Sequence, residues 1–384
     1  MKSSNKFIAG LLISLFILPL QLILTDFSFA KEPAPAKETP ASQVILPPKE
    51  GKVELTEKRT ATSKTYLKSD GGKEMTVYQS PIHYQDSKKQ WQEINVNLQD
   101  SKIQIIPTAP KEYENTANNF RISLSDNLAQ KAFSLQKNDA QVDLKLSDIK
   151  SADGTNFGFT KESLDNVKPE RYQNRLTYKN VYKDTDITYY SMTSGLKEDI
   201  VLNSYSGQNQ FTFDLNVSNA SYEKQKDGSY IFYKPGTKEI QLRMPKFYMW
   251  DNFGGKDSES NRYSYDVGTE IVDNNGSLTV VLTADNNWLS SKDRVFPITI
   301  DPSFVTNDIE DPYVHTGYPD VKAWDQRALW VGQGSTKGIM RSLVLFNIPV
   351  PDLYGARISS SRFEVLQYGN CTGVCTSAGV SAFT

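Results

Sequence analysis

The residues of this sequence that could do chemistry are first of all two pairs of acids, Glu198-Asp199 and Asp184 with Asp186. Glycoside hydrolysis needs two carboxyl groups that face each other across a cleft, one of them kept protonated. Neighbours in a β-strand point to opposite faces, so Glu198 and Asp199 cannot form such a pair together. Asp184 and Asp186 would share a side in an extended strand, but the run 183–186 is more typical of a turn. Both pairs are predicted to be structural or solvated acids.

Patterns for other kinds of catalysis are missing from the sequence. It has no GxSxG elbow, and its two histidines, His83 and His315, lie far apart and outside HExxH and CxxC patterns. The loop Gly332–Gly338 follows a predicted strand as a phosphate loop would, but it lacks the GxxxxGK[ST] spacing and leads into another strand. We therefore expect no zinc site and no enzyme.

Two cysteines, Cys371 and Cys375, lie in a CxxxC arrangement in a glycine-containing loop. The spacing differs from that of redox motifs, and no βαβ pattern surrounds it. In an exported chain a local disulfide is the favoured interpretation, and two free thiols are the alternative.

Aromatic side chains near the C-terminus could bind carbohydrate, because sugars stack their flat C–H faces on exposed rings. Trp330 is predicted to point away from the core face that Leu329 and Val331 share, and three further rings precede it: Trp324, Tyr318 and Tyr313. The alternative is that these rings pack beneath further strands.

Three acids in the same segment, Asp308, Glu310 and Asp311, could supply oxygen ligands to Ca²⁺. Their spacing matches no defined calcium loop, so a solvated turn is the alternative. No other cofactor is expected.

The composition limits the partners. The chain has 384 residues, 38% of them hydrophobic, and 43 basic against 45 acidic residues give a formal charge of -2. This length predicts two or three domains. A nearly neutral chain gives no electrostatic support for nucleic acid or an anionic membrane as partner.

The first 30 residues have the three parts of a secretory signal: Lys2 and Lys6, an apolar stretch 7–24, and small residues before a cleavage site after Ala30. An uncleaved membrane anchor is the alternative, but Pro19 interrupts the stretch. After cleavage we expect no stable membrane insertion. Residues 31–56 are predicted to be a linker, with five prolines in 31–50.

From residue 57 onward, short strand-forming runs alternate with turn dipeptides, which predicts an all-β protein. Phe211, Phe213 and Leu215 alternate with polar residues, as in a sandwich. Only Ser125–Lys131 and Asp285–Ser291 look helical. Four hairpins are predicted: Thr60–Leu67 with Glu74–Tyr78, Ile82–Tyr84 with Trp91–Leu98, Ser221–Glu223 with Tyr230–Tyr233, and Glu270–Val272 with Leu278–Leu282.

Several stretches, in this order, resemble the opening of secreted wall-associated proteins of Gram-positive bacteria, members of the Rhs/YD-repeat polymorphic toxin group. They are SKTY at 63–66, VYQSPIHY at 77–84, WQEI at 91–94, YKNVYKDTDITY at 178–189, GLKEDIVL at 195–202 and FPITIDP at 296–302. After Pro302, LWVG at 329–332, RSLVLFNIP at 341–349 and ARI at 356–358 resemble a DNRLRE-type domain, a carbohydrate-binding-module-like jelly roll.

The strand patterns predict a multi-hairpin β-sandwich region over 57–302, as one unit or as two that divide near 150–170. The resemblance after Pro302 implies an incomplete jelly-roll-like β-sandwich over 303–384, because such domains run well over a hundred residues. This shortness leaves open whether the chain is a fragment.

The function implied is that of a noncatalytic, exported module associated with the Gram-positive cell wall, which anchors and presents the N-terminal part of a contact-dependent toxin. Wall polysaccharide or peptidoglycan would be its partner. The alternatives are a secreted polysaccharide-degrading enzyme, with its catalytic part in 60–302, and a purely structural wall protein.

Overall fold

The computed structural model describes residues 51–101, 110–155, 164, 166–255, 261–306, 313–317, 332–334, 338–342, 344, 346, 348–349 and 353–361. The predicted signal segment, its cleavage site after Ala30 and residues 31–50 of the predicted linker lie outside these residues. Strand β1 (Lys52–Glu54) already falls within the range 31–56 expected for the linker.

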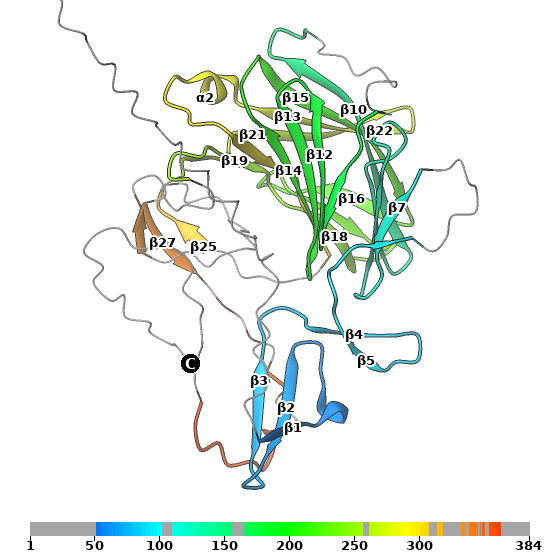
Figure 1. The fold of residues 1–384 in the computed structure, drawn as a ribbon, viewed down its shortest axis with the longest axis vertical. Helices are drawn as coiled ribbons and strands as arrows, with labels where there is room; N and C mark the ends of the chain where they lie inside the picture. Colours follow the sequence, from blue (N-terminus) through cyan, green and yellow to red (C-terminus); the bar gives the residue numbers. More distant parts are fainter. Residues whose placement is uncertain are drawn as a thin grey trace, which may run out of the picture. The chain divides into compact units, whose positions relative to one another are not determined.

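Two small antiparallel sheets form the first part of the described chain (Figure 1). One pairs β1 with β2 (Ser63–Lys68) and β2 with β3 (Lys73–Val77), and a 3-10 turn, η1 (Thr56–Lys58), follows β1. The other pairs β4 (His83–Gln85) with β5 (Trp91–Glu93). Both hairpins predicted here form, but the second strand of the latter ends at Glu93 and does not reach Leu98 as expected. In the turn between β2 and β3, Asp70 Oδ1 accepts a hydrogen bond from the amide of Gly72 at 2.8 Å.

An 8-stranded antiparallel sheet follows, in the order β21-β22-β15-β10-β9-β8-β7-β6. Its longest strands, β10 and β15, pair with each other, so residues on either side of 150–170 belong to one sheet. The strands are β6 (Gln99–Asp100), β7 (Glu112–Asn115), β8 (Arg121–Ser125), β9 (Phe133–Lys137), β10 (Ala140–Ser151), β15 (Gln208–Ser218), β21 (Val267–Asn274) and β22 (Ser277–Ala284).

An 11-stranded sheet lies against the first one. Its main path is β11-β12-β13-β14-β24-β18-β17-β16, and β23 also pairs with β14 and joins β19 and β20 to the sheet. The strands are β11 (Glu170–Tyr172), β12 (Arg175–Tyr182), β13 (Thr185–Ser191), β14 (Gly195–Leu202), β16 (Ser221–Lys224), β17 (Tyr230–Tyr233), β18 (Ile240–Met244), β19 (Tyr248–Trp250), β20 (Tyr263–Ser264), β23 (Ile298–Asp301) and β24 (Phe304–Val305).

The close pairing of β14 with β24 requires a glycine at its start. A Cβ on Gly195 would lie 2.1 Å from the carbonyl oxygen of Phe304, so no other residue fits without moving backbone. Because β24 belongs to this sheet, the sandwich extends at least to Val305, past the boundary expected after residue 302.

The two large sheets share one hydrophobic core, with buried residues from Leu98 to Phe304. Phe133 of β9 contacts Tyr189 of β13 and Phe304 of β24 edge to face, with ring centroids 5.8 and 5.5 Å apart. The hydroxyl of Tyr178 in β12 donates to the carbonyl of Ser125 in β8, across the two sheets. These contacts confirm the predicted all-β sandwich.

Local predictions in the sandwich are confirmed at most positions. Phe211, Phe213 and Leu215 are buried while Asp214 is exposed, and the hairpins β16–β17 and β21–β22 form as expected. The short helix α2 (Asn286–Ser290) matches Asp285–Ser291, and Asp285 caps it by accepting from the amide of Asn287.

The helix predicted over Ser125–Lys131 is wrong. Ser125 ends strand β8, and the residues after it form a turn. Ser125 Oγ accepts from the amide of Asn127 at 3.0 Å, and Asn127 Oδ1 accepts from the amide of Ala129 at 2.9 Å. These side chains satisfy the backbone amides locally and so compete with the helix.

In the C-terminal part, the described residues include a 3-stranded sheet in the order β25-β27-β26. Its strands are β25 (Tyr313–His315), β26 (Gly332–Gly334) and β27 (Gly338–Ser342). The loop predicted at Gly332–Gly338 thus begins in β26 and leads into β27, as expected of a hairpin. The jelly roll expected over 303–384 stays a prediction.

Candidate functional site

Most of the predicted site residues lie outside the described part of the chain. These are Trp330, Trp324 and Tyr318 for carbohydrate, Cys371 and Cys375 for a disulfide, and Asp308, Glu310 and Asp311 for calcium. Tyr313 begins β25, where the structure describes the backbone only. These assignments stay predictions.

The acids Glu198 and Asp199 point to opposite faces of β14, as predicted. Glu198 lies among the core residues Leu196 and Ile200 and is 1% exposed. The hydroxyl of Tyr189 donates to Glu198 Oε1 at 3.0 Å. Burial, with smaller contributions from the nearby acids Asp301 and Asp199, raises the pKa of Glu198 to about 8, although the hydrogen bond from Tyr189 opposes the shift. Glu198 is therefore a protonated acid in the core at neutral pH, with a structural role.

Asp199 belongs to a buried group of charges on the outer face of the same strand. Lys197 Nζ lies 2.5 Å from Asp199 Oδ1 and also contacts Asp301 Oδ2 in β23. The side chains of Lys197, Asp199 and Asp301 are 9%, 8% and 8% exposed. We call Lys197, Asp199, Asp301 and Ser303, whose hydroxyl donates to Asp301 Oδ1, the Lys197 cluster.

Aromatic rings adjoin the Lys197 cluster. The ring of Trp250 in β19 lies 5.4 Å from Lys197 Nζ, and the ring of Tyr248 stacks on Trp250 at 5.4 Å between centroids. Tyr263 stacks on both rings at 6.3 Å. Trp250 is 9% and Tyr263 7% exposed, so these rings shield the charges and do not form an open platform for sugars.

The second predicted pair of acids also serves the fold. Asp184 lies in the turn between β12 and β13 with a positive φ of 56°, and its carboxylate accepts from Ser204 Oγ at 2.6 Å. Asp186 accepts from Lys179 Nζ at 2.9 Å and from the amide of Asn180 at 2.8 Å. Within the described ranges, no group of three or more His, Cys, Asp or Glu side chains could hold a metal ion.

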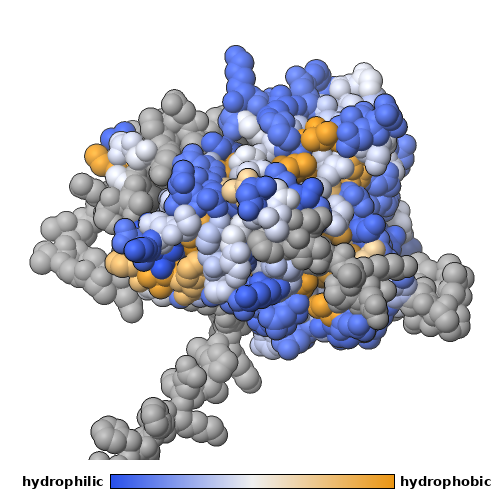
Figure 2. Space-filling view, turned by 90° about the horizontal axis from the view of Figure 1, so that it is seen from above, coloured by the Kyte–Doolittle hydropathy of each residue, from blue (hydrophilic) through white to orange (hydrophobic). Residues whose placement is uncertain are grey.

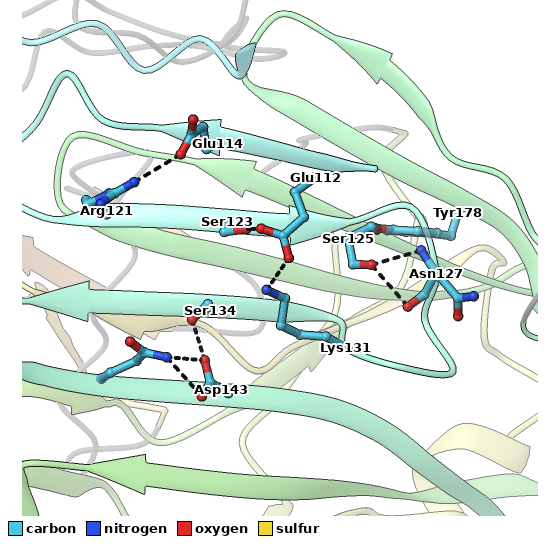
Figure 3. A network of polar contacts seen from close by, with 11 residues as sticks. Glu112, Glu114, Arg121, Ser123, Ser125, Asn127, Lys131, Ser134, Asp143 and Tyr178 are labelled. Carbon is cyan, nitrogen blue, oxygen red and sulfur yellow. Dashed lines mark hydrogen bonds and ion pairs between the residues drawn. The ribbon is translucent and has the colours of Figure 1, made fainter. Parts of the chain in front are cut away.

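Polar contacts also link the strands at one side of the 8-stranded sheet (Figure 3). Glu112 in β7 accepts from Ser123 Oγ at 2.6 Å and from Lys131 Nζ at 2.5 Å. Burial raises the pKa of Glu112, but Lys131 and Ser123 outweigh it, so the net shift is downward. Arg121 pairs with Glu114 at 3.1 Å on the neighbouring strands. These acids bind the strands to one another and show no catalytic arrangement.

A polar hollow lies beside the turns β9–β10, β15–β16 and β17–β18, with a volume of about 660 Å³. The buried Gln241 joins two of its walls, because its Oε1 accepts from Asn138 Nδ2 at 2.8 Å and its Nε2 donates to Glu239 Oε1 at 3.0 Å. Carboxamides and carboxylates dominate the lining, which consists of Gln136, Asn138, Asp139, Ala140, Asn219, Lys234, Pro235, Glu239 and Gln241.

On the face that Figure 2 shows, hydrophilic residues dominate among the described residues, with hydrophobic areas between them. Among the residues that the structure describes, no helix is long and apolar enough to cross a membrane.

Fold and side-chain contacts together define a β-sandwich protein whose buried acids are engaged within its own structure. The chain is 30% identical over 278 residues to the tRNA nuclease WapA of Bacillus subtilis (strain 168), an alignment of 71% of this chain and 11% of that protein. It is 29% identical over 297 residues, 75% of the chain and 12% of the relative, to the tRNA3(Ser)-specific nuclease WapA of Bacillus spizizenii.

The chain thus spans about a tenth of the length of these curated relatives. No protein-family model matches it. No solved structure matches it either.

Proposed function

We propose that this chain is a noncatalytic, exported module of the Gram-positive cell wall that anchors and presents the N-terminal part of a Rhs/YD-type contact-dependent toxin. The observation that carries the proposal is the alignment with the WapA proteins, which takes in 71% of this chain but 11% of the relative. The nuclease activity in the relatives' names belongs to far longer proteins. The acids of the sandwich support a noncatalytic role, because both predicted pairs are engaged in structural contacts.

We further propose wall polysaccharide or peptidoglycan as the partner. The polar hollow supports this, because carboxamides and carboxylates can pair with the hydroxyl groups of a sugar as donors and acceptors. Its buried Gln241 fixes the side chains of Asn138 and Glu239 before any ligand arrives. The predicted rings Trp330, Trp324, Tyr318 and Tyr313 would add a stacking surface.

The test is a pull-down of residues 31–384 on purified Gram-positive cell walls, with reducing-sugar release assayed in the same tube. We expect the protein to sediment with the walls and to release no reducing ends. Release of reducing ends would favour the secreted polysaccharide-degrading enzyme instead. Failure to sediment would contradict wall association.

Two sets of variants then separate the proposed binding surfaces. Gln136→Ala with Asp139→Ala alters the hollow, and Trp330→Ala removes the most favoured ring. Loss of wall binding in one set of variants assigns wall binding to the surface that this set alters. Asp227→Ala, in the turn between β16 and β17, is the control and should bind normally. Unchanged binding in both sets would leave a wall protein without sugar specificity, the structural alternative.

A further inference from the structure

The Lys197 cluster lies where three strands meet in the middle of the 11-stranded sheet. β14 pairs with β24 at Leu196 opposite Phe304, and with β23 at Ile200 opposite Ile300. β14 keeps one register with β23 and with β24. Asp199 therefore falls opposite Asp301, and Lys197 opposite Ser303. Two carboxylates directly opposite each other are unfavourable without a cation between them, and Lys197 Nζ occupies that place.

We propose that Lys197 and Asp301 join in an intramolecular amide bond between Nζ and Cγ. Asp199 transfers the protons, and Ser303 holds the oxygen that becomes the amide carbonyl. Such a bond would tie the middle of the chain to the strand that enters the sheet 104 residues later.

Proximity is the first argument. Lys197 Nζ already contacts Asp301 Oδ2, and the ladder between β14 and β23 holds both backbones in place. Reacting groups that a rigid frame holds in contact behave as if their concentrations were enormous, about 10⁵ M or more.

Exclusion of water is the second argument. Amide formation releases water, so a dry site favours it, and all three charged side chains of the cluster are at least nine-tenths buried. The ring of Trp250 lies over the amine at 5.4 Å. The cross-strand pair Lys145–Asp214 is the contrast: its side chains are 42% and 52% exposed, its atoms lie 3.2 Å apart, and water competes there.

The remaining groups complete the chemistry. Asp199 Oδ1 lies 2.5 Å from Lys197 Nζ, within reach for proton transfer. Ser303 Oγ donates to Asp301 Oδ1, the oxygen that would carry the developing negative charge, and the amide of Glu198 donates to Ser303 Oγ at 3.4 Å. A nucleophile, an electrophile, a proton carrier and a donor to the oxyanion therefore stand together.

The step balances without another reactant. Asp199 takes one proton from the Lys197 ammonium and passes it to Oδ2 of Asp301, so that the free amine meets a neutral carboxylic acid. The amine then attacks Cγ, which forms the C–N bond and moves one electron pair onto Oδ1. A second proton passes from the attacking nitrogen, by way of Asp199, to Oδ2. The C–Oδ2 bond breaks, one water leaves, and Asp199 ends as the carboxylate it was.

Mass spectrometry of the denatured full chain tests the proposal. We expect a protein lighter by one water, about 18 Da, than its sequence requires. Trypsin should then yield a branched peptide in which 184–224, uncut at Lys197, is joined to 295–322. A mass equal to that of the sequence, with cleavage after Lys197, would overturn the proposal and leave an ion pair only.

Variants assign the roles. Lys197→Arg keeps the charge and Asp301→Ala removes the electrophile, so both variants should have the mass that their sequences require. Asp199→Ala should also lack the amide bond, although Lys197 and Asp301 are both still present. The control Lys145→Arg should retain it. A bond that forms to completion in Asp199→Ala would overturn the role of Asp199. Because the wild-type mass is decisive by itself, poor folding of a variant does not affect the test.

Discussion

The small N-terminal sheets (β1–β5) and the sandwich (β6–β24) are held together by different forces. The shared hydrophobic core of the described residues begins only at Leu98 and draws on both large sheets. In the N-terminal sheets the buried residues are few, and polar ones such as Lys64 and His83 are among them. Ion pairs connect this region: Arg59, which follows η1, pairs with Glu54 of β1 at 2.7 Å, and Lys64 of β2 pairs with Glu93 of β5 at 2.6 Å.

This difference follows from size. A sheet of three short strands cannot bury enough apolar surface to offset its conformational entropy, so specific polar contacts carry more of its stability. His83 illustrates this: its Nδ1 lies 2.7 Å from the carbonyl oxygen of Thr60, and burial lowers its pKa, so the ring is neutral at pH 7. The comparison predicts that truncation of apolar side chains matters most in the sandwich, and removal of charges in the N-terminal sheets.

The largest effect is expected from Phe133→Ala. Phe133 is fully buried and contacts Tyr189 and Phe304 from the opposite sheet, so its loss should lower the free energy of unfolding by about 3–5 kcal/mol. Urea unfolding monitored by tryptophan fluorescence measures it. A loss below about 1 kcal/mol would mean that the two sheets are not packed through this ring.

Glu198→Gln should change how stability depends on pH. The pKa of Glu198 is about 8 in the fold against 4.5 as the ordinary value. Between these values the folded state holds a proton that the unfolded state has lost, so stability falls as pH rises, by at most about 1.4 kcal/mol per pH unit. Gln cannot ionise, so urea unfolding at pH 5 and pH 8 should show a smaller decline in the variant. If the free energy of unfolding fell as much between pH 5 and pH 8 in the variant as in the original protein, Glu198 would be ruled out as the source of this pH dependence.

Arg59→Met should loosen the N-terminal sheets without affecting the sandwich. Hydrogen bonding by Arg59 lowers the pKa of Glu54 below its ordinary value of 4.5. The pair therefore stabilises the fold above pH 4.5, and this contribution is lost as the pH falls through the lowered pKa that Glu54 has in the folded state. At pH 7 we expect about 1–3 kcal/mol less protection of the β1–β3 amides in hydrogen exchange. Equal loss of protection in β10 and β15 would contradict the separation of the two regions.

Lys145→Met should have the smallest effect. The pair of Lys145 with Asp214 is exposed, so its removal should change the free energy of unfolding by less than about 1 kcal/mol, and less still at high salt. Urea unfolding at two salt concentrations measures it. A larger loss than in Arg59→Met would reverse the comparison between the regions.

Local features of the fold could be predicted from the sequence, and long-range ones could not. Alternation in 211–215 and the glycine-containing turns specify strands and hairpins over a few residues, and the opposite directions of Glu198 and Asp199 follow from strand geometry alone. The helix expected at Ser125–Lys131 failed because Ser125 and Asn127 bond to nearby backbone amides, which a pattern of helix-forming residues does not reveal.

The Lys197 cluster was missed for a different reason. Its members Lys197 and Asp301 are 104 residues apart, and only the pairing of β14 with β23 brings them together. The motif GLKEDIVL contains Lys197, and the motif FPITIDP contains Asp301. The sequence therefore shows both residues but does not show that they lie close together. Pairing of strands so far apart depends on the packing of the whole sandwich.

The position of β24 bears on the order in which the chain can fold as it is made. β24 lies between β14 and β18, so both of these strands are made before the segment that pairs with their facing edges. A nascent chain that ends before residue 304 would expose the unpaired edges of β14 and β18. The 11-stranded sheet can therefore complete its pairing only after residue 305 has been made.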